Sequence, residues 1–151
     1  MTKLIYNCST FEKLTNFELY QIMRLRQEVF IVEQNCPYLD ADGKDIYSHQ
    51  IMGKDENGKI HCCTRLLPEG ISYVGFTSIG RVANSAEVRG SGEGRYLMEY
   101  SIKMINQLYP NIPIKIGAQQ YLKKFYENLG FSDIGIPYLE DGIPHIIMVR
   151  M

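Results

Sequence analysis

Apolar and polar residues along this chain recur at two spacings, and each spacing predicts a different kind of element. Between Leu19 and Val29, apolar side chains return every three to four residues, which predicts an amphipathic helix ending near Phe30. Thr15 stands three residues before Glu18, the arrangement of a capping box, so the helix should begin at this pair.

Short runs of apolar and β-branched residues elsewhere predict strands. Asn57-Gly58 separates two such runs, and an Asn-Gly pair in that position is the strongest local signal of a hairpin. The predicted strands lie at residues 4–8, 49–53, 60–66, 76–83 and 112–116, with further strands after Phe131 and over 145–151.

Two more helices are predicted in the second half of the chain. One runs over about residues 95–108 and ends before Pro110, and the other runs over 121–129 and stops at Gly130, in a left-handed cap. Because an early antiparallel hairpin is followed by strand–helix–strand units, we predict a single α/β domain over 1–151. Its core would be a mixed β-sheet flanked by helices.

Composition narrows the classes of function. The 16 basic and 17 acidic residues give a net charge of -1, so nothing favours nucleic acid or an anionic membrane as a partner. No apolar run approaches the roughly 20 residues that cross a bilayer, and the first residues are too polar for a secretory segment. The four cysteines lack metal-type spacing, and Cys62 and Cys63 are adjacent. We therefore expect free thiols, no metal site and a cytoplasmic location.

The clearest chemical signal is the glycine-rich stretch over residues 89–95, Arg-Gly-Ser-Gly-Glu-Gly-Arg, between a predicted strand and a predicted helix. Its three glycines let consecutive main-chain N–H groups face one point at a helix N-terminus, where an anion such as a pyrophosphate is favoured. A turn that only joins strand to helix explains the glycines equally well. A Rossmann fingerprint would need glycine at Arg95, and no P-loop Gly-Lys-Ser/Thr occurs.

Arg89-x-x-Gly92-x-Gly94 resembles the coenzyme A motif of the GCN5-related N-acetyltransferase (GNAT) superfamily. Gln119 followed by the segment 125–131, Phe-Tyr-Glu-Asn-Leu-Gly-Phe, resembles the second signature of that superfamily. Segments 25–38, 117–119 and 140–145 further resemble its ElaA-like branch, so that the likeness covers the chain from Ile22 to its end.

This resemblance implies that the fourth and fifth strands splay apart and hold the pantetheine arm of coenzyme A in the gap. It implies an N-acyltransferase that moves acetyl from acetyl-CoA to an amine, with Tyr126 near the sulfur. Main chain would meet the pantetheine, the glycine turn would hold the pyrophosphate, and Gln119 would touch the arm. The cofactor-binding residues implied in this way are Val82, Ala83, Asn84, Arg89, Gly90, Ser91, Gly92, Glu93, Gly94, Arg95 and Gln119. Asn84 and Glu93 depart from the usual pattern, and Glu93 fits only if its side chain points away from the anion.

Amine attack on a thioester needs a neutral nucleophile and a proton for the departing thiolate. The Tyr126 hydroxyl suits the second task, although a helix tyrosine packed beside Phe125 is the structural alternative. Three side chains or an ordered water are open as the general base: Glu33, His49 and His145. The residues expected at the acceptor amine are Glu33, Gln34, Asn35 and His145, and a nucleophilic Cys36 is disfavoured because direct transfer needs no covalent intermediate.

The Asp-rich loop at 40–45 fails as an EF-hand, because a loop with Gly43 at position six would start at Tyr38 and end at His49. Two other classes compete with a catalytic acetyltransferase: a non-catalytic acyl-CoA-binding module, and an interaction protein that reuses the fold. The expected partner is a small-molecule or protein amine. Neither the acceptor nor the acyl length follows from the residues, and the sequence is compatible with a homodimer.

Overall fold

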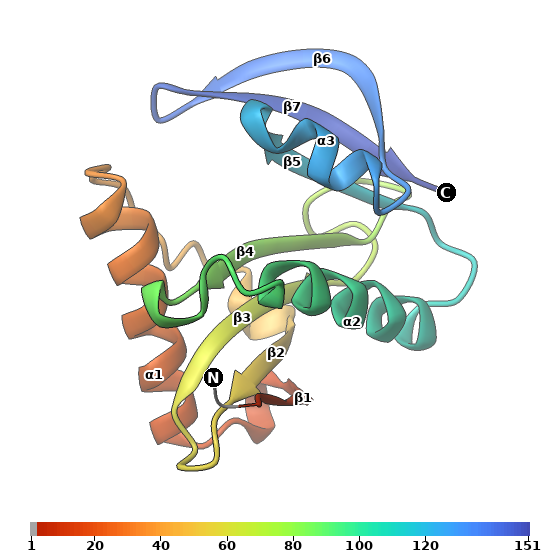
Figure 1. Cartoon of the computed structure of the whole chain (residues 1–151). Helices are drawn as coiled ribbons and strands as arrows, with labels where there is room; N and C mark the ends of the chain where they lie inside the picture. The colour runs from red at the N-terminus through yellow and green to blue at the C-terminus, as the bar shows by residue number, and fades with distance from the viewer. Residues whose placement is uncertain (1–2) are drawn as a thin grey trace.

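Two antiparallel sheets form the framework of the computed structural model, which describes residues 3–151 (Figure 1). The first has the order β1-β2-β3-β4, with strands Ile5–Thr10, His49–Lys54, Ile60–Leu67 and Ser78–Asn84. The second has the order β5-β7-β6, with strands Ile114–Gln119, Ile143–Arg150 and Ser132–Glu140. No helix among residues 3–151 has both the length and the apolar character needed to cross a membrane.

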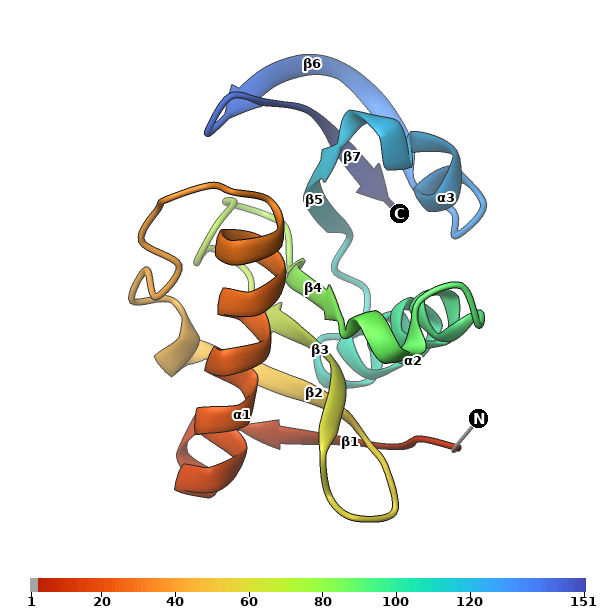
Figure 2. The ribbon, with the colours of Figure 1, turned by 60° about the vertical axis from the view of Figure 1, so that its left-hand side comes forward.

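The two sheets meet through a short parallel contact between the residues that precede or begin β4 and β5. Thr77 N donates to Pro113 O at 3.0 Å, and Lys115 N donates to Thr77 O at 2.9 Å. Beyond this point the two strands belong to different sheets and diverge (Figure 2). The predicted α/β domain with splayed central strands is thus confirmed.

The first helix begins where the sequence predicts and ends later. Thr15 Oγ1 accepts from Glu18 N at 3.0 Å, and Glu18 Oε1 accepts from Thr15 N at 2.9 Å, which completes the capping box. Helix α1 spans Asn16–Arg26 and continues as the π-helical segment η2, Gln27–Glu33. The predicted end at Phe30 is therefore wrong by three residues, because no helix-breaking residue occurs before Asn35, which adopts a φ of 49°.

The later helices also differ from the prediction at their ends. Helix α2 spans Glu93–Leu108, two residues earlier than expected, because Gly92 takes a φ of 87° and serves as its N-cap. The predicted helix 121–129 is split into a 3₁₀ turn and the short α3, Lys123–Glu127. Gly130 has the predicted left-handed conformation, with a φ of 94°. The 3₁₀ turn before α3 is Gln120–Leu122, and further 3₁₀ turns are Phe11–Lys13, Asp45–Tyr47 and Ala86–Val88.

Helices α1 and α2 cover opposite faces of the first sheet. Cys62 on β3 packs in the larger core cluster with Leu97 and Met98 of α2. Its neighbour Cys63 points to the other face, where it packs in a second cluster with Ile22 of α1. All five of these apolar side chains are fully buried, so the two helices fix the first sheet from both sides.

Strand β4 contains a bulge that the sequence pattern did not reveal. On β3, Cys63 pairs with Ala83 and Arg65 with Gly80, so β4 has one more residue than β3 between these pairs. Arg81 lies in this bulge with a φ of 50°, a left-handed conformation that is rare for arginine. The predicted strands 76–83 and 112–116 both start two residues later than expected, at Ser78 and Ile114.

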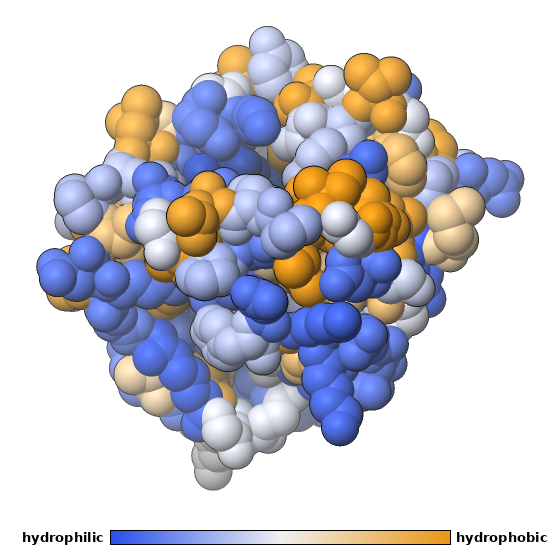
Figure 3. Space-filling model, turned by 90° about the horizontal axis from the view of Figure 1, so that it is seen from above, coloured by the Kyte–Doolittle hydropathy of each residue, from blue (hydrophilic) through white to orange (hydrophobic). Residues whose placement is uncertain are grey.

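The second sheet leaves β6 as an edge strand over one end of the molecule. Ile136 and Leu139 of β6 are 52% and 72% exposed. Seen from above, this end carries hydrophobic groups among hydrophilic ones (Figure 3). The larger core cluster instead joins side chains of the first sheet and α2 with those of β5, β7 and α3.

Candidate active site

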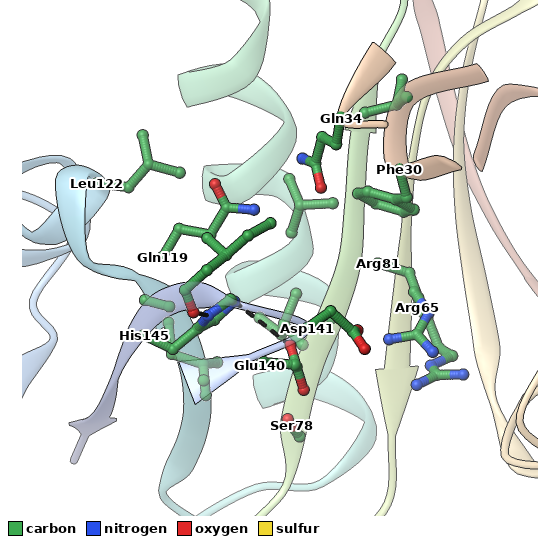
Figure 4. Close-up of a pocket in the computed structure, with 18 of the residues that line it drawn as sticks. Phe30, Gln34, Arg65, Ser78, Arg81, Gln119, Leu122, Glu140, Asp141 and His145 are labelled. Atoms are coloured by element: carbon green, nitrogen blue, oxygen red, sulfur yellow. Dashed lines mark hydrogen bonds and ion pairs between the residues drawn. The ribbon is translucent and has the colours of Figure 1, made fainter. Parts of the chain in front are cut away.

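A cleft of about 730 Å³ lies where β4 and β5 diverge. Segment η2 lines one side of it, and the β6–β7 hairpin lines the other. In Figure 4, Gln119 and His145 lie on one side, Arg65 and Arg81 on the other, and Asp141 extends into the space between them. The cleft thus collects side chains from parts of the sequence that are more than a hundred residues apart.

The predicted cofactor residues divide into two groups. Val82, Asn84, Arg89, Gly94 and Gln119 line the cleft. Those that do not line it are Ala83, Gly90, Ser91, Gly92, Glu93 and Arg95. Ala83 is fully buried on the α1 face of β4, whereas the other five belong to the turn and first residues of α2.

The glycine turn has the geometry of an anion site. Gly90 and Gly92 have φ values of 79° and 87°, and an added Cβ on either would meet no atom within 4 Å. Gly92 caps α2 without a side-chain hydrogen bond. Across residues 3–151, no main-chain acceptor pairs with the N–H of Gly92, Gly94 or Arg95. These free donors at a helix N-terminus fit a pyrophosphate.

Glu93 turns its carboxylate away from this turn and toward β1. Its Oε2 accepts a hydrogen bond of 2.6 Å from the Tyr6 hydroxyl. Burial, and then this hydrogen bond, raise the pKa of Tyr6 above its ordinary value, so the phenol stays the donor. The orientation that an anion in the turn requires of Glu93 is the one that the structure has.

Arg89 ties the end of η2 to the end of β4. Its guanidinium pairs with Glu33 and donates to the main-chain oxygen of Asn84, at 2.9 Å from Nη2 and 3.1 Å from Nε. The hydrogen bond from Arg89 lowers the pKa of Glu33. Glu33, expected at the acceptor, is thus held by an arginine expected at the phosphates, while Gln34 lines the cleft and Asn35 does not.

Asn84 carries an unsatisfied polar atom at the cleft. Its Oδ1 is buried and has no hydrogen-bond partner within the described part of the chain. Its Nδ2 lies 3.6 Å from the point where a Cβ on Gly94 would stand, so the side chain faces the start of α2. An unpaired buried acceptor in a cleft is costly unless a bound molecule donates to it.

Tyr126 is 6% exposed and faces the cleft. Its ring packs edge-on against Phe125 and Phe131, with centroids 5.1 and 5.8 Å apart. Burial raises the pKa of Tyr126 to about 12, so the hydroxyl keeps its proton at neutral pH and can donate it. The packing role and the position at the cleft therefore coexist in this residue.

Of the three candidate bases, His145 is the histidine that lines the cleft, and both of its ring nitrogens have polar neighbours. Its Nδ1 lies 2.7 Å from the main-chain oxygen of Ile143, which can only accept, so Nδ1 carries a proton. Its Nε2 lies 3.3 Å from Glu140 Oε2, a contact that is favourable when a proton lies between the two atoms. His49 does not line the cleft, and burial lowers its pKa.

The Asp-rich loop binds arginines, which the sequence analysis missed. Arg26 of α1 is fully buried; its Nε lies 2.8 Å from Asp40 Oδ2 and its Nη1 lies 2.7 Å from Asp45 Oδ1. Burial alone would raise the pKa of Asp45, but the hydrogen bond and charge of Arg26 lower it overall. The sequence shows the aspartates as a cluster, but their arginine partners lie far from them in the chain and belong to no motif.

The same loop holds the bulge of β4. Asp42 accepts two hydrogen bonds from Arg65, at 2.8 and 3.1 Å, and a third of 3.2 Å from Arg81 in the bulge. Arg81 Nε also forms an ion pair of 2.8 Å with Asp40. Burial opposes ionisation of Asp42, yet the hydrogen bond from Arg65 brings its pKa to about 2. The loop therefore holds the side chain of Arg81, the residue with the left-handed backbone conformation in the bulge of β4.

Two tyrosines that the sequence analysis passed over also line the cleft, Tyr73 and Tyr138. A Cβ on Gly117 would overlap the Tyr138 hydroxyl, so glycine permits this close approach over β5. Burial raises the pKa of Tyr138 to about 12. Neither tyrosine belongs to a recognisable motif, and only the fold brings them to the cleft.

Known proteins similar to this chain share its motifs and its fold. Residues 48–151 match the family described as acetyltransferase (GNAT) domain. Protein ElaA of Escherichia coli K12 is 38% identical over 140 residues, which cover 91% of this chain and 90% of ElaA. The crystal structure of Escherichia coli ElaA superposes with a TM-score of 0.90 at 35% identity and covers 98% of this chain and 99% of that chain. An acyl-CoA N-acyltransferase from Pseudomonas aeruginosa has a TM-score of 0.93 at 39% identity, with the same coverage of 98% and 99%.

Proposed function

Because this chain belongs to the GNAT acetyltransferase family, we propose that it transfers an acyl group from acyl-CoA to an amine by direct attack. Acetyl-CoA is the proposed donor. The observation that carries the proposal is the cleft between the splayed β4 and β5, with an open glycine turn beside it and a buried tyrosine within it.

The residues present fit an acyl-CoA. The free N–H groups at Gly92, Gly94 and Arg95 suit its pyrophosphate, and the unpaired Oδ1 of Asn84 suits an amide donor of the pantetheine arm. Gln119 lines the same cleft on the β5 side. When bound, the donor supplies a thioester, whose carbonyl carbon is the electrophile.

Two groups of the chain handle protons in the proposed reaction. As the amine nitrogen bonds to the carbonyl carbon and the C–S bond breaks, Tyr126 gives its hydroxyl proton to the leaving sulfur. The pair of His145 and Glu140 takes the proton that the nitrogen loses, since these groups already face each other at 3.3 Å. A proton leaves the nitrogen and a proton reaches the sulfur, so the step is balanced.

Ligand binding and turnover together test the proposal. Acetyl-CoA at millimolar concentration should raise the Tm of the protein, because a ligand that binds the native state stabilises it. Release of free thiol from acetyl-CoA should then depend on an added amine. The absence of any Tm shift contradicts the proposal. A Tm shift without turnover across a broad amine panel indicates instead a non-catalytic acyl-CoA-binding module.

A further inference from the structure

Two charged side chains in the cleft, one cation and one anion, have no oppositely charged partner among residues 3–151. Among the cleft residues, Arg65 and Arg81 pair with Asp42, Arg89 pairs with Glu33, and Glu140 faces His145. Lys44 and Asp141 also line the cleft, and neither has an oppositely charged group within 4 Å among residues 3–151.

Lys44 is the surplus cation beside a balanced cluster. The three arginines at positions 26, 65 and 81 face the three aspartates at 40, 42 and 45, so this cluster is neutral without Lys44. Lys44 is half-buried, and within the described part of the chain its Nζ donates only to the Ser72 hydroxyl, at 3.0 Å. A partly desolvated ammonium whose partner is a neutral hydroxyl can still bind an anion.

The cleft that Lys44 lines offers further room and hydrogen-bond donors. Ser78 lines the cleft and is 7% exposed. Gly80, two residues along β4, would meet no atom within 4 Å if it carried a Cβ. Arg65 pairs across from Gly80, and its buried Nε has no hydrogen-bond partner within the described residues. The cleft that Lys44 lines thus also contains a buried hydroxyl, a side-chain N–H without a partner among residues 3–151, and open space beside Gly80.

Asp141 lies on the opposite side, at the tip of the β6–β7 hairpin. Asp141 and Gly142 have φ values of 51° and 79°, the two left-handed residues of a tight hairpin turn. In Figure 4 the side chains of Glu140 and Asp141 extend into the cleft. These carboxylates attract an ammonium, and Glu140 lies beside His145, the proposed proton acceptor.

We propose that the acceptor is an amine that also bears a carboxylate, with the amine at Asp141 and Glu140 and the carboxylate at Lys44. This deepens the proposed acyl transfer and rests on it for the identity of the reaction, but not for the binding. A carboxylate carries one negative charge and balances Lys44, whereas a phosphate carries nearly two and would leave negative charge facing Asp141. An amino acid is the simplest molecule of this class.

The test compares each amino acid with its primary amide, which keeps the amine and removes the negative charge. The parent protein should acetylate the free acid about tenfold to a hundredfold more efficiently in kcat/KM, the typical effect of one hydrogen bond to a charged group. Lys44→Met, which keeps the aliphatic stem, should bring the acid down to the level of the amide. Lys44→Arg should restore part of the difference. Lys103→Met, on the exposed face of α2 and outside the cleft, is the matched control and should behave as the parent.

Equilibrium binding separates this inference from the proposed reaction. N-acetyl amino acids and their amides are titrated into the CoA-loaded protein by calorimetry, a measurement that needs no turnover. Binding that favours the acid in the parent and loses that preference in Lys44→Met supports the carboxylate site, even if no acceptor is acetylated. Equal binding of acid and amide, no binding of either, or a preference that survives Lys44→Met would overturn it.

Discussion

Replacing Arg26 with Met tests whether the buried ion cluster stabilises the fold. The substitution removes a fully buried cation that lies 2.8 and 2.7 Å from two carboxylates, each 7% exposed. Loss of one member of a buried ion pair costs about 3–5 kcal/mol, because the remaining charge is left uncompensated. Asp40 keeps Arg81 as a partner and Asp45 keeps Arg65 at 3.4 Å, so we expect the lower end, about 3 kcal/mol.

The loss of unfolding free energy in Arg26→Met, relative to the parent, should depend on pH in a definite direction. In the parent, the folded-state pKa of Asp45 lies below its unfolded value, so its contribution is present above that value and lost as the pH falls. In Arg26→Met the buried carboxylate of Asp45 loses its main partner, and its pKa should rise above the unfolded value. The variant then gains stability on acidification while the parent loses it, so the deficit should be largest near pH 7 and narrow toward about pH 4.

Urea unfolding followed by circular dichroism at pH 7 and about pH 4 measures both quantities. Arg24→Met on the same helix is the matched control, because the Arg24 side chain is 70% exposed and its ion pair is with Glu28, which is also exposed. Its effect should stay within about 0.5 kcal/mol. An Arg26→Met deficit no larger than that of Arg24→Met, or one that does not change with pH, would refute the reasoning.

Three further substitutions test the proposed donor site. Tyr126→Phe keeps the ring packing but deletes the acid, so the single-turnover rate should fall about a hundredfold with CoA affinity unchanged by calorimetry. An unchanged rate would leave the tyrosine with packing alone. Gly92→Asp should abolish CoA binding, because it adds a side chain at a φ of 87° and a negative charge at the turn. Glu93→Ala should leave CoA affinity intact but cost about 1–2 kcal/mol of unfolding free energy through the lost Tyr6 hydrogen bond, and a larger affinity loss than for Gly92→Asp would contradict the observed orientation.

Elements specified by neighbouring residues were the ones that the sequence predicted well. The capping box at Thr15 and the glycine stop at Gly130 each depend on a few adjacent residues, and both occur as predicted. The π-helical continuation through Phe30 and the bulge at Arg81 depend on packing and on contacts with the Asp-rich loop. No periodicity in the sequence encodes such features.

The same distinction applies to the candidate site. The glycine turn and Tyr126 lie in compact motifs, and the structure brings part of that turn and the tyrosine to the cleft. The pairing of Arg26 with Asp45, and of Glu140 with His145, is decided by the side chains that the fold places face to face. The unpaired charges of Lys44 and Asp141 become visible only after every other charge in the cleft has been matched with its partner.

In a regular strand, successive side chains alternate between the two faces of the sheet, and the bulge in β4 shifts this alternation. Before it, Ile79 points to the α2 face; after it, Val82 packs on that same face while Ala83 points to α1, so the alternation has shifted by one residue. If β4 kept Arg81 but lost the bulge, Val82 and Asn84 would turn toward α1, away from the partners they now have, and an insertion elsewhere in the strand would exchange its two faces in the same way. Strand β4 should therefore tolerate substitutions more readily than insertions or deletions. Among homologous chains, we expect gaps in an alignment to avoid residues 78–84 even where the amino acids differ.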